Sequence, residues 1–202
     1  MAYSSWSVTT GETPSTVKWN VLGTNDAFFN TQVGSNFSSG TTSTVWYEEL
    51  GRTQLGSSGD TISVSSFSAR KYLRLQMLLI PSGSINTNIT FNSDTGNNYS
   101  YRYSANGASD TSLTSQANIE VHITGTLSNI VVIDVLNIAA QEKLAYWSNT
   151  GLGAAGATTA PSRLEGAAKW TNTSAQITTV TLTNDDPGSY DTGSLLTVLG
   201  HD

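Results

Sequence analysis

The segment Ile85-Asn86-Thr87-Asn88-Ile89-Thr90-Phe91 shows the pattern that decides the fold. Its odd-numbered positions are apolar or Thr, and the positions between them are Asn or Thr. Successive side chains of a β-strand point to opposite faces, so this segment would present one apolar face and one polar face. The same period of two recurs at 119–124 and at 179–183. The pattern predicts strands with one face in a core and the other in solvent.

Two further segments are mostly apolar on both faces. Residues 73–80 carry Arg74 and Gln76 among Leu, Met and Ile, and residues 130–138 carry Asp134 and Asn137 among Val, Ile and Leu. A strand that is apolar on both faces is typical of the centre of a sheet that is covered on two sides. We therefore predict two central strands, each buried on both faces.

The remaining strands are predicted from β-rich runs that turn residues separate. They lie near 45–50, 61–64, 99–103, 143–147, 164–170 and 195–199. Nine to eleven short strands with such turns indicate an all-β fold, an antiparallel β-sandwich of the jelly-roll type, spanning residues 44–202.

The composition excludes several classes of protein. Thr, Ser and Asn (29, 28 and 16 residues) make up more than a third of the chain, whereas charged residues make up 12%. That charge content is too low for a coiled coil or a disordered polyelectrolyte. A net charge of -6 with nine Lys and Arg does not suit a nucleic-acid partner, which needs clustered cations. The absence of Cys excludes disulfides and zinc-thiolate sites, and we expect no cofactor.

No targeting or membrane segment is expected. The first residues lack the basic and apolar regions of a signal peptide. The longest apolar runs, 73–80 and 130–138, are far shorter than the ~20 residues that cross a bilayer. We expect a soluble protein that is made in a cytoplasm and has no membrane partner.

Residues 1–43 are predicted to form an N-terminal arm. Thr13-Pro14 is a helix start signal, because Thr caps the first turn and Pro suits the first helical position. The helix would span about 14–30 and continue into a connector rich in Gly, Ser and Thr. Its apolar side chains, the predicted contact residues, are Val17, Trp19, Val21, Leu22, Phe28 and Phe29. Two interpretations stay open: the helix covers one end of its own domain, or it docks onto a neighbouring subunit or capsid.

Catalytic motifs are missing, and we expect no enzyme. The sequence has no phosphate-binding Gly-Lys-Ser/Thr loop and no Gly-x-Ser-x-Gly elbow. Paired carboxylates of a glycosidase could come from Glu48, Glu49, Glu120, Asp134, Glu142 and Glu165. Asp134 interrupts an apolar strand, and an unpaired buried charge is costly. We therefore predict a buried ion pair between Asp134 and Arg74 rather than a catalytic role.

Two neighbouring features could bind a ligand. The oxygen-rich loop 92–98 could hold calcium, although Gly96 stands where the next ligand belongs, so a tight turn with Asx hydrogen bonds is the favoured interpretation. Tyr99, Tyr101 and Tyr103 would share one strand face, and with Trp147 they could stack on sugar rings. The same row could instead pack a core or a subunit contact.

The chain also resembles the virion structural proteins of tailed bacteriophages. Four segments carry the resemblance: 13–30 (TPSTVKWNVLGTNDAFFN), 91–102 (FNSDTGNNYSYR), 160–174 (APSR through KWTNTS) and the ending from Gly193 to Gly200. The resemblance implies a jelly-roll body on a phage particle. We therefore expect a capsid decoration (cement) protein in the virion, a homotrimer whose partners are the major capsid protein or other virion proteins. The alternative is a tail-fibre or receptor-binding module that recognises host carbohydrate.

Overall fold

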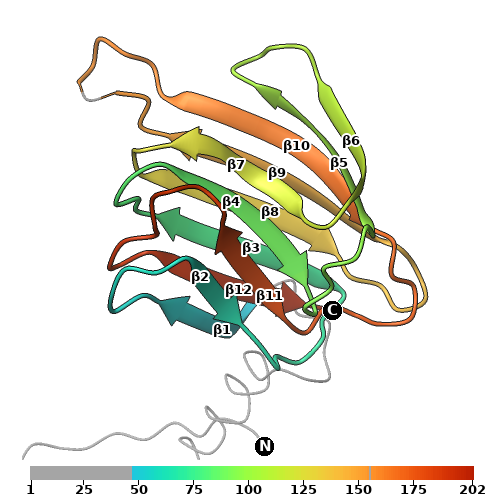
Figure 1. The fold of residues 1–202 in the computed structure, drawn as a ribbon. Helices are drawn as coiled ribbons and strands as arrows, with labels where there is room; N and C mark the ends of the chain where they lie inside the picture. Colours follow the sequence, from blue (N-terminus) through green and yellow to red (C-terminus); the bar gives the residue numbers. More distant parts are fainter. Residues whose placement is uncertain (1–46, 155) are drawn as a thin grey trace, which may run out of the picture. The chain divides into compact units, whose positions relative to one another are not determined.

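The computed structural model describes residues 47–154 and 156–202, and in these ranges the chain forms β-strands, turns and loops without a helix. The predicted helix at 14–30 and its contact residues lie outside the described residues. The expectation of an all-β body is confirmed by the twelve strands of the described part (Figure 1). The strands are β1 (Glu48–Gln54), β2 (Thr61–Val64), β3 (Tyr72–Leu79), β4 (Ile85–Phe91), β5 (Tyr99–Ala105), β6 (Thr111–Gln116), β7 (Ile119–Gly125), β8 (Asn129–Leu136), β9 (Lys143–Gly151), β10 (Ser162–Trp170), β11 (Val180–Asn184) and β12 (Leu195–His201).

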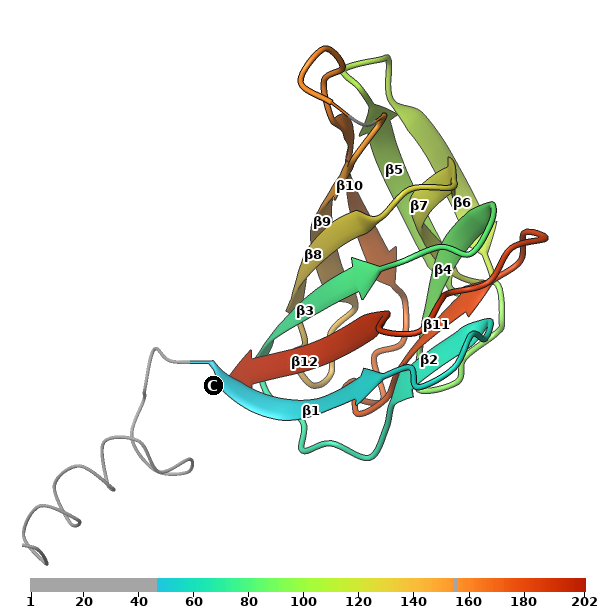
Figure 2. The ribbon, with the colours of Figure 1, turned by 90° about the vertical axis from the view of Figure 1, so that its left-hand side faces the viewer.

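The strands pair into two antiparallel sheets. The larger sheet has eight strands in the order β1-β12-β3-β8-β9-β10-β5-β6, and the smaller has four in the order β2-β11-β4-β7. Figure 2 shows the larger sheet curving around the smaller one, with β12, β3, β8, β9 and β10 following one another along one side. Of the twelve strands, β6 was not predicted, because its sequence TSLTSQ has the composition of a loop.

The core lies between the two sheets. From β4 it receives Ile85, Ile89 and Phe91, all at most 1% exposed, as the alternation of this segment predicts. The polar member of that face, Thr87, is fully buried and accepts a hydrogen bond of 3.1 Å from the Tyr190 hydroxyl. A buried hydroxyl with a partner avoids the cost of desolvation. The inward alternation of the strands thus accounts for the sandwich.

The prediction that two strands are buried on both faces is wrong in one respect. β3 and β8 are central and pair with each other along their whole length. Their inward residues are buried, but Tyr72, Leu78 and Ile130 on the outward side are 39%, 38% and 60% exposed. Nothing in residues 47–154 and 156–202 covers that side. Among the described residues, the second apolar face is therefore uncovered.

Candidate interaction surface

The outward side of the larger sheet is a regular grid of side chains. Strands β12, β3, β8, β9 and β10 each contribute four outward residues, and the strand register aligns them in four rows. We call these twenty residues the open face. By rows they are Leu195, Leu78, Ile130, Thr150 and Arg163; Thr197, Gln76, Val132, Ser148 and Glu165; Leu199, Arg74, Asp134, Tyr146 and Ala167; and His201, Tyr72, Leu136, Leu144 and Lys169.

Half of the open face is apolar, although none of its side chains is fully buried. The most exposed of these apolar residues are Tyr146 (61%), Ile130 (60%) and Leu144 (54%). The first row is apolar from β12 to β8, and the fourth row is apolar from β3 to β9. A solvated sheet face ordinarily alternates to polar residues, and contiguous exposed apolar patches mark interaction sites. The open face is thus the candidate functional surface.

Arg74 and Asp134 form an ion pair near the middle of this face. They are register partners on β3 and β8, and two of the three guanidinium nitrogens, Nε and Nη2, each donate to the Asp134 carboxylate at 2.7 Å. The bidentate bond from Arg74 holds the pKa of Asp134 below its usual value, and a hydrogen bond from the Tyr146 hydroxyl adds to this. The structure therefore brings together the two residues that the sequence paired. The pair is not in the core, because the Arg74 and Asp134 side chains are 37% and 16% exposed.

The other charges of the open face also have partners of opposite sign. Lys169 Nζ lies 3.1 Å from Glu142, and Arg163 lies 3.6 Å from Glu165. These carboxylates belong to the set considered for glycoside hydrolysis, and each of them faces its own cation. A salt-bridged face carries little net charge, so a protein partner can cover it without repulsion.

An aromatic cluster closes one corner of the open face. The ring of His201 stacks on Tyr72 with centroids 4.8 Å apart and meets the edge of Tyr47 at 4.6 Å. The Arg74 guanidinium lies 5.4 Å from the Tyr47 ring centroid, within cation–π range. Tyr47 precedes β1 directly, so the chain enters the sheet at this corner.

The outward side of the smaller sheet differs in kind. We call the outward residues of β2, β4 and β11 that are at least partly exposed the small-sheet face; they are Thr61, Ser63, Asn86, Thr90, Thr181 and Thr183. None of them is apolar, and the four strands of this sheet contain neither Lys nor Arg. On the edge strand β7, burial raises the pKa of Glu120, and the nearby carboxylate of Asp185 raises it further. Acidic groups here therefore repel one another without a neighbouring cation.

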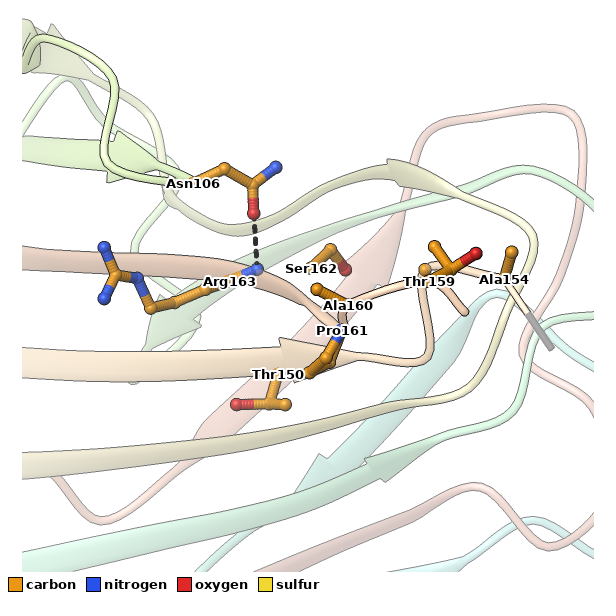
Figure 3. Close-up of a pocket in the computed structure, with 9 residues that line it drawn as sticks. Asn106, Thr150, Ala154, Thr159, Ala160, Pro161, Ser162 and Arg163 are labelled. Carbon is orange, nitrogen blue, oxygen red and sulfur yellow. Dashed lines mark hydrogen bonds between the residues drawn. The ribbon is translucent and has the colours of Figure 1, made fainter. Parts of the chain in front are cut away.

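A pocket of about 810 Å³ lies beside the β9–β10 connection (Figure 3). It is lined by Asn106, Thr150, Gly153, Ala154, Thr159, Ala160, Pro161, Ser162 and Arg163. The carbonyl oxygen of the Asn106 side chain accepts a hydrogen bond of 2.8 Å from the Arg163 backbone NH, which ties the β5–β6 turn to β10. The lining offers hydroxyl and methyl groups and one guanidinium that already faces Glu165. This set holds no paired acid and base.

Of the interpretations left open for the aromatic row, core packing is the one that the structure supports. Tyr99, Tyr101 and Trp147 are 0%, 6% and 2% exposed, and Tyr103 is partly buried against them. The Tyr101 and Trp147 rings meet edge to face with centroids 6.4 Å apart. Buried rings cannot stack on a sugar, so the carbohydrate interpretation is wrong for Tyr99, Tyr101 and Trp147. The inward register of β5 and β9 places them there.

The loop at 92–98 is a tight turn built around one carboxylate. Asp94 accepts hydrogen bonds from Trp170 Nε1 at 2.7 Å, from the Gly96 backbone NH at 2.9 Å and from the Asn98 amide at 3.0 Å. Burial opposes ionisation of Asp94, but these bonds outweigh it and leave its pKa below the usual value. The turn interpretation is confirmed.

Sequence reasoning missed one buried cation. Lys143 at the start of β9 is 1% exposed, and its Nζ donates to the carbonyl oxygens of Gln141 at 2.6 Å and Asn172 at 3.0 Å. Desolvation lowers its pKa. The segment 143–147 was correctly predicted as a strand, but its sequence gives no sign that Lys143 occupies an inward position.

Comparisons with protein-family models, with curated proteins and with solved structures find no match for this chain. Within the described ranges, no group of three or more His, Asp or Glu side chains could hold a metal ion, and no helix is long and apolar enough to cross a membrane.

Proposed function

We propose that this protein is a structural component of a phage virion, a capsid decoration (cement) protein that binds protein neighbours by contact. The observation that carries the proposal is the open face, where exposed apolar residues surround salt-bridged charges. Protein interfaces combine such apolar anchors with paired polar groups, and they need no catalytic residues. The resemblance of four segments to phage virion proteins agrees with this proposal.

We also propose that the sandwich is a jelly roll. The supporting feature is the order in which the chain visits the sheets. Strands β1, β3, β8 and β12 lie adjacent to one another in the larger sheet, and β2, β4, β7 and β11 make up the smaller one. Each of the consecutive pairs β1–β2, β3–β4, β7–β8 and β11–β12 crosses from one sheet to the other, as strands of a jelly roll do. The hairpins β5–β6 and β9–β10 then extend the larger sheet as insertions.

The receptor-binding alternative loses its main support. It rested on Tyr99, Tyr101, Tyr103 and Trp147 as a platform for sugar rings, and three of these are core residues. The decoration function depends instead on the open face and on the predicted arm, residues 1–43. In this proposal the homo-oligomer and its capsid partner remain as expected from the sequence.

Co-sedimentation with capsids of the parent phage tests the proposal. The full chain should pellet with capsids and saturate, whereas a chain that begins at residue 44 should remain folded but lose binding. The truncated chain retains every core residue of the described ranges, and its melting transition serves as the control for folding. A full chain that never pellets with capsids would refute the decoration function. A truncated chain that binds like the full one would refute the role of the arm.

A further inference from the structure

We infer that Asn106 is a site of covalent modification, which loses its side-chain amide through a succinimide when the turn between β5 and β6 opens. The inference uses only this turn and its contact with β10, and it does not depend on the proposed function. Asn106-Gly107 is the one Asn-Gly pair in the sequence. Both residues are exposed, so solvent reaches the reacting groups.

The reaction needs only the chain and water. The backbone nitrogen of Gly107 attacks Cγ of Asn106, the new N–Cγ bond closes a five-membered ring, and the Cγ–Nδ2 bond breaks. The amide leaves as ammonia and takes the proton of the Gly107 nitrogen with it. Water then opens the ring at Cγ, which gives aspartate, or at the backbone carbonyl carbon, which gives isoaspartate. Glycine favours the first step because it has no Cβ beside the attacking nitrogen.

The folded turn prevents this attack. Asn106 and Gly107 have φ of 52° and 79°, and the Ala108 NH donates to the Ala105 carbonyl oxygen at 2.9 Å. Two central residues of positive φ inside such a bond form a type I′ turn. To attack, the Gly107 nitrogen must lie on the same side of the Asn106 Cα–C bond as Cβ, whereas a ψ of about +30° in a type I′ turn places it nearly opposite. The turn must therefore open before the ring can close.

Three further hydrogen bonds hold the turn closed. The Asn106 NH donates to the Arg163 carbonyl oxygen at 2.8 Å, and the Arg163 NH donates to Asn106 Oδ1 at 2.8 Å (Figure 3). The Ser104 hydroxyl donates to the Ala108 carbonyl oxygen at 2.7 Å. The bond to Oδ1 restrains the side-chain amide as well as the backbone. Asn106 is thus protected while the turn is docked on β10, and it becomes reactive once the turn is released.

Isoaspartate then keeps the turn from closing again. Its backbone runs through Cβ and Cγ, so the turn gains a backbone atom and the Ala108 NH no longer meets the Ala105 carbonyl oxygen. The oxygen that accepts from the Arg163 NH also leaves its position. Aspartate, in contrast, retains the normal backbone and an acceptor at Oδ1. Opening of the turn is therefore converted into a permanent change beside Arg163, at the start of β10.

Ala108→Pro in the full chain tests the inference. Pro has no NH, so this substitution removes the bond that closes the type I′ turn and leaves Asn106-Gly107 in place. We expect the folded variant to lose the Asn106 amide about tenfold faster than the wild type, because local opening no longer limits the reaction. The wild type in concentrated urea should react at least as fast as this variant. Digestion and mass spectrometry after incubation at mildly alkaline pH locate and quantify the loss.

Ala139→Pro is the matched control, at an exposed turn position at the opposite end of β9, and it should lose the Asn106 amide at the wild-type rate. Urea midpoints show that both variants keep the folded body. Ser104→Ala, which removes one turn bond without a Pro, should give a smaller acceleration and serves if Ala108→Pro does not fold. A folded wild type that reacts as fast as the chain in urea overturns the inference. So does an Ala108→Pro variant, or in its place a Ser104→Ala variant, that reacts no faster than the wild type.

Hydrogen exchange at the Arg163 NH tests the effect of the product. The purified isoaspartate form should lose protection at this NH, whereas Asn106→Asp, with the same added charge and a normal backbone, should keep it. Equal protection in the two forms would overturn the permanent opening of the turn. Loss of the amide first at another asparagine would overturn the site itself. Asn92 is the sharpest comparison, since its Nδ2 and Oδ1 both make hydrogen bonds and Ser93 follows it.

Discussion

The open face and the small-sheet face are the two outer sides of one sandwich, and they share a core but little else. Strands of both sheets alternate, and the inward residues of β3, β8, β9 and β12 in the larger sheet and of β2 and β4 in the smaller sheet are buried. Outward, the small-sheet face presents Thr, Ser and Asn, whereas half of the open face is apolar. The core requires only the inward half of each strand, so stability of the sandwich does not explain the apolar outward half. We propose that contact with a protein neighbour does.

The two sides also differ in whether their carboxylates have cationic partners. On the larger sheet a carboxylate such as Asp134 has a cation as its register partner. On the smaller sheet burial raises the pKa of Glu120, and the carboxylate of Asp185, rather than a cation, lies near it and raises that pKa further. Paired charges suit a surface that a partner dehydrates, and unpaired acids suit a surface that stays in water. Three substitutions test this contrast, beginning with the turn that joins the two sheets.

The largest effect is expected at Asp94, between β4 of the smaller sheet and β5 of the larger one. Asp94→Ala leaves the indole NH of Trp170 without an acceptor, and Trp170 is fully buried. Loss of this bond and of the turn bonds should lower the free energy of unfolding by about 2 kcal/mol. Urea denaturation at pH 7 measures it.

Asp185→Asn is the control for the loss of one negative charge, because Asp185 is exposed. It should change the free energy of unfolding by less than about 0.5 kcal/mol. Equal effects of the two substitutions would mean that net charge, and not the Trp170 bond, determines the stability of this turn.

A smaller effect is expected at the ion pair of the open face. Asp134→Asn breaks the bidentate bond to Arg74, and because the pair is partly exposed the loss should be about 1 kcal/mol. The folded state holds the pKa of Asp134 below its unfolded value of 3.8. The wild type should therefore keep this advantage above pH 4 and lose it progressively as the pH falls below that value. The urea midpoints of the wild type and of Asp134→Asn, measured between pH 2.5 and 7, should converge in acid. A difference in midpoint that persists at low pH would contradict the stabilising role of the ionised Asp134 carboxylate.

The alternation of apolar and polar residues along the sequence was sufficient to predict most strands and the inward faces of β4 and β11. It was also sufficient to pair Arg74 with Asp134, since both interrupt apolar strands that were expected to be central. It could not distinguish a second apolar face that the same domain covers from one that stays open, as at Ile130. Nor could it show that Tyr99 and Trp147 point inward, because strand register depends on partners that are distant in the sequence. Those partners decide which residues form the surface.

The smallest effect is expected at Glu120, and its sign is opposite to that of Asp134. Its pKa is raised from 4.5 in the folded state, so the native chain binds a proton more tightly than the unfolded chain does. Stability should then increase as the pH falls from 7 toward 4.5, because protonation relieves the burial of charge and the repulsion from Asp185. Glu120→Gln removes that charge at every pH and should stabilise the protein at pH 7 by a few tenths of a kcal/mol. The advantage of Glu120→Gln over the wild type in free energy of unfolding should disappear near pH 4.5.

Glu165→Gln is the control, because it breaks an ion pair on the open face, and it should not stabilise the protein at pH 7. If both variants were more stable than the wild type at pH 7, the two sides of the sandwich would not differ in whether their carboxylates have cationic partners.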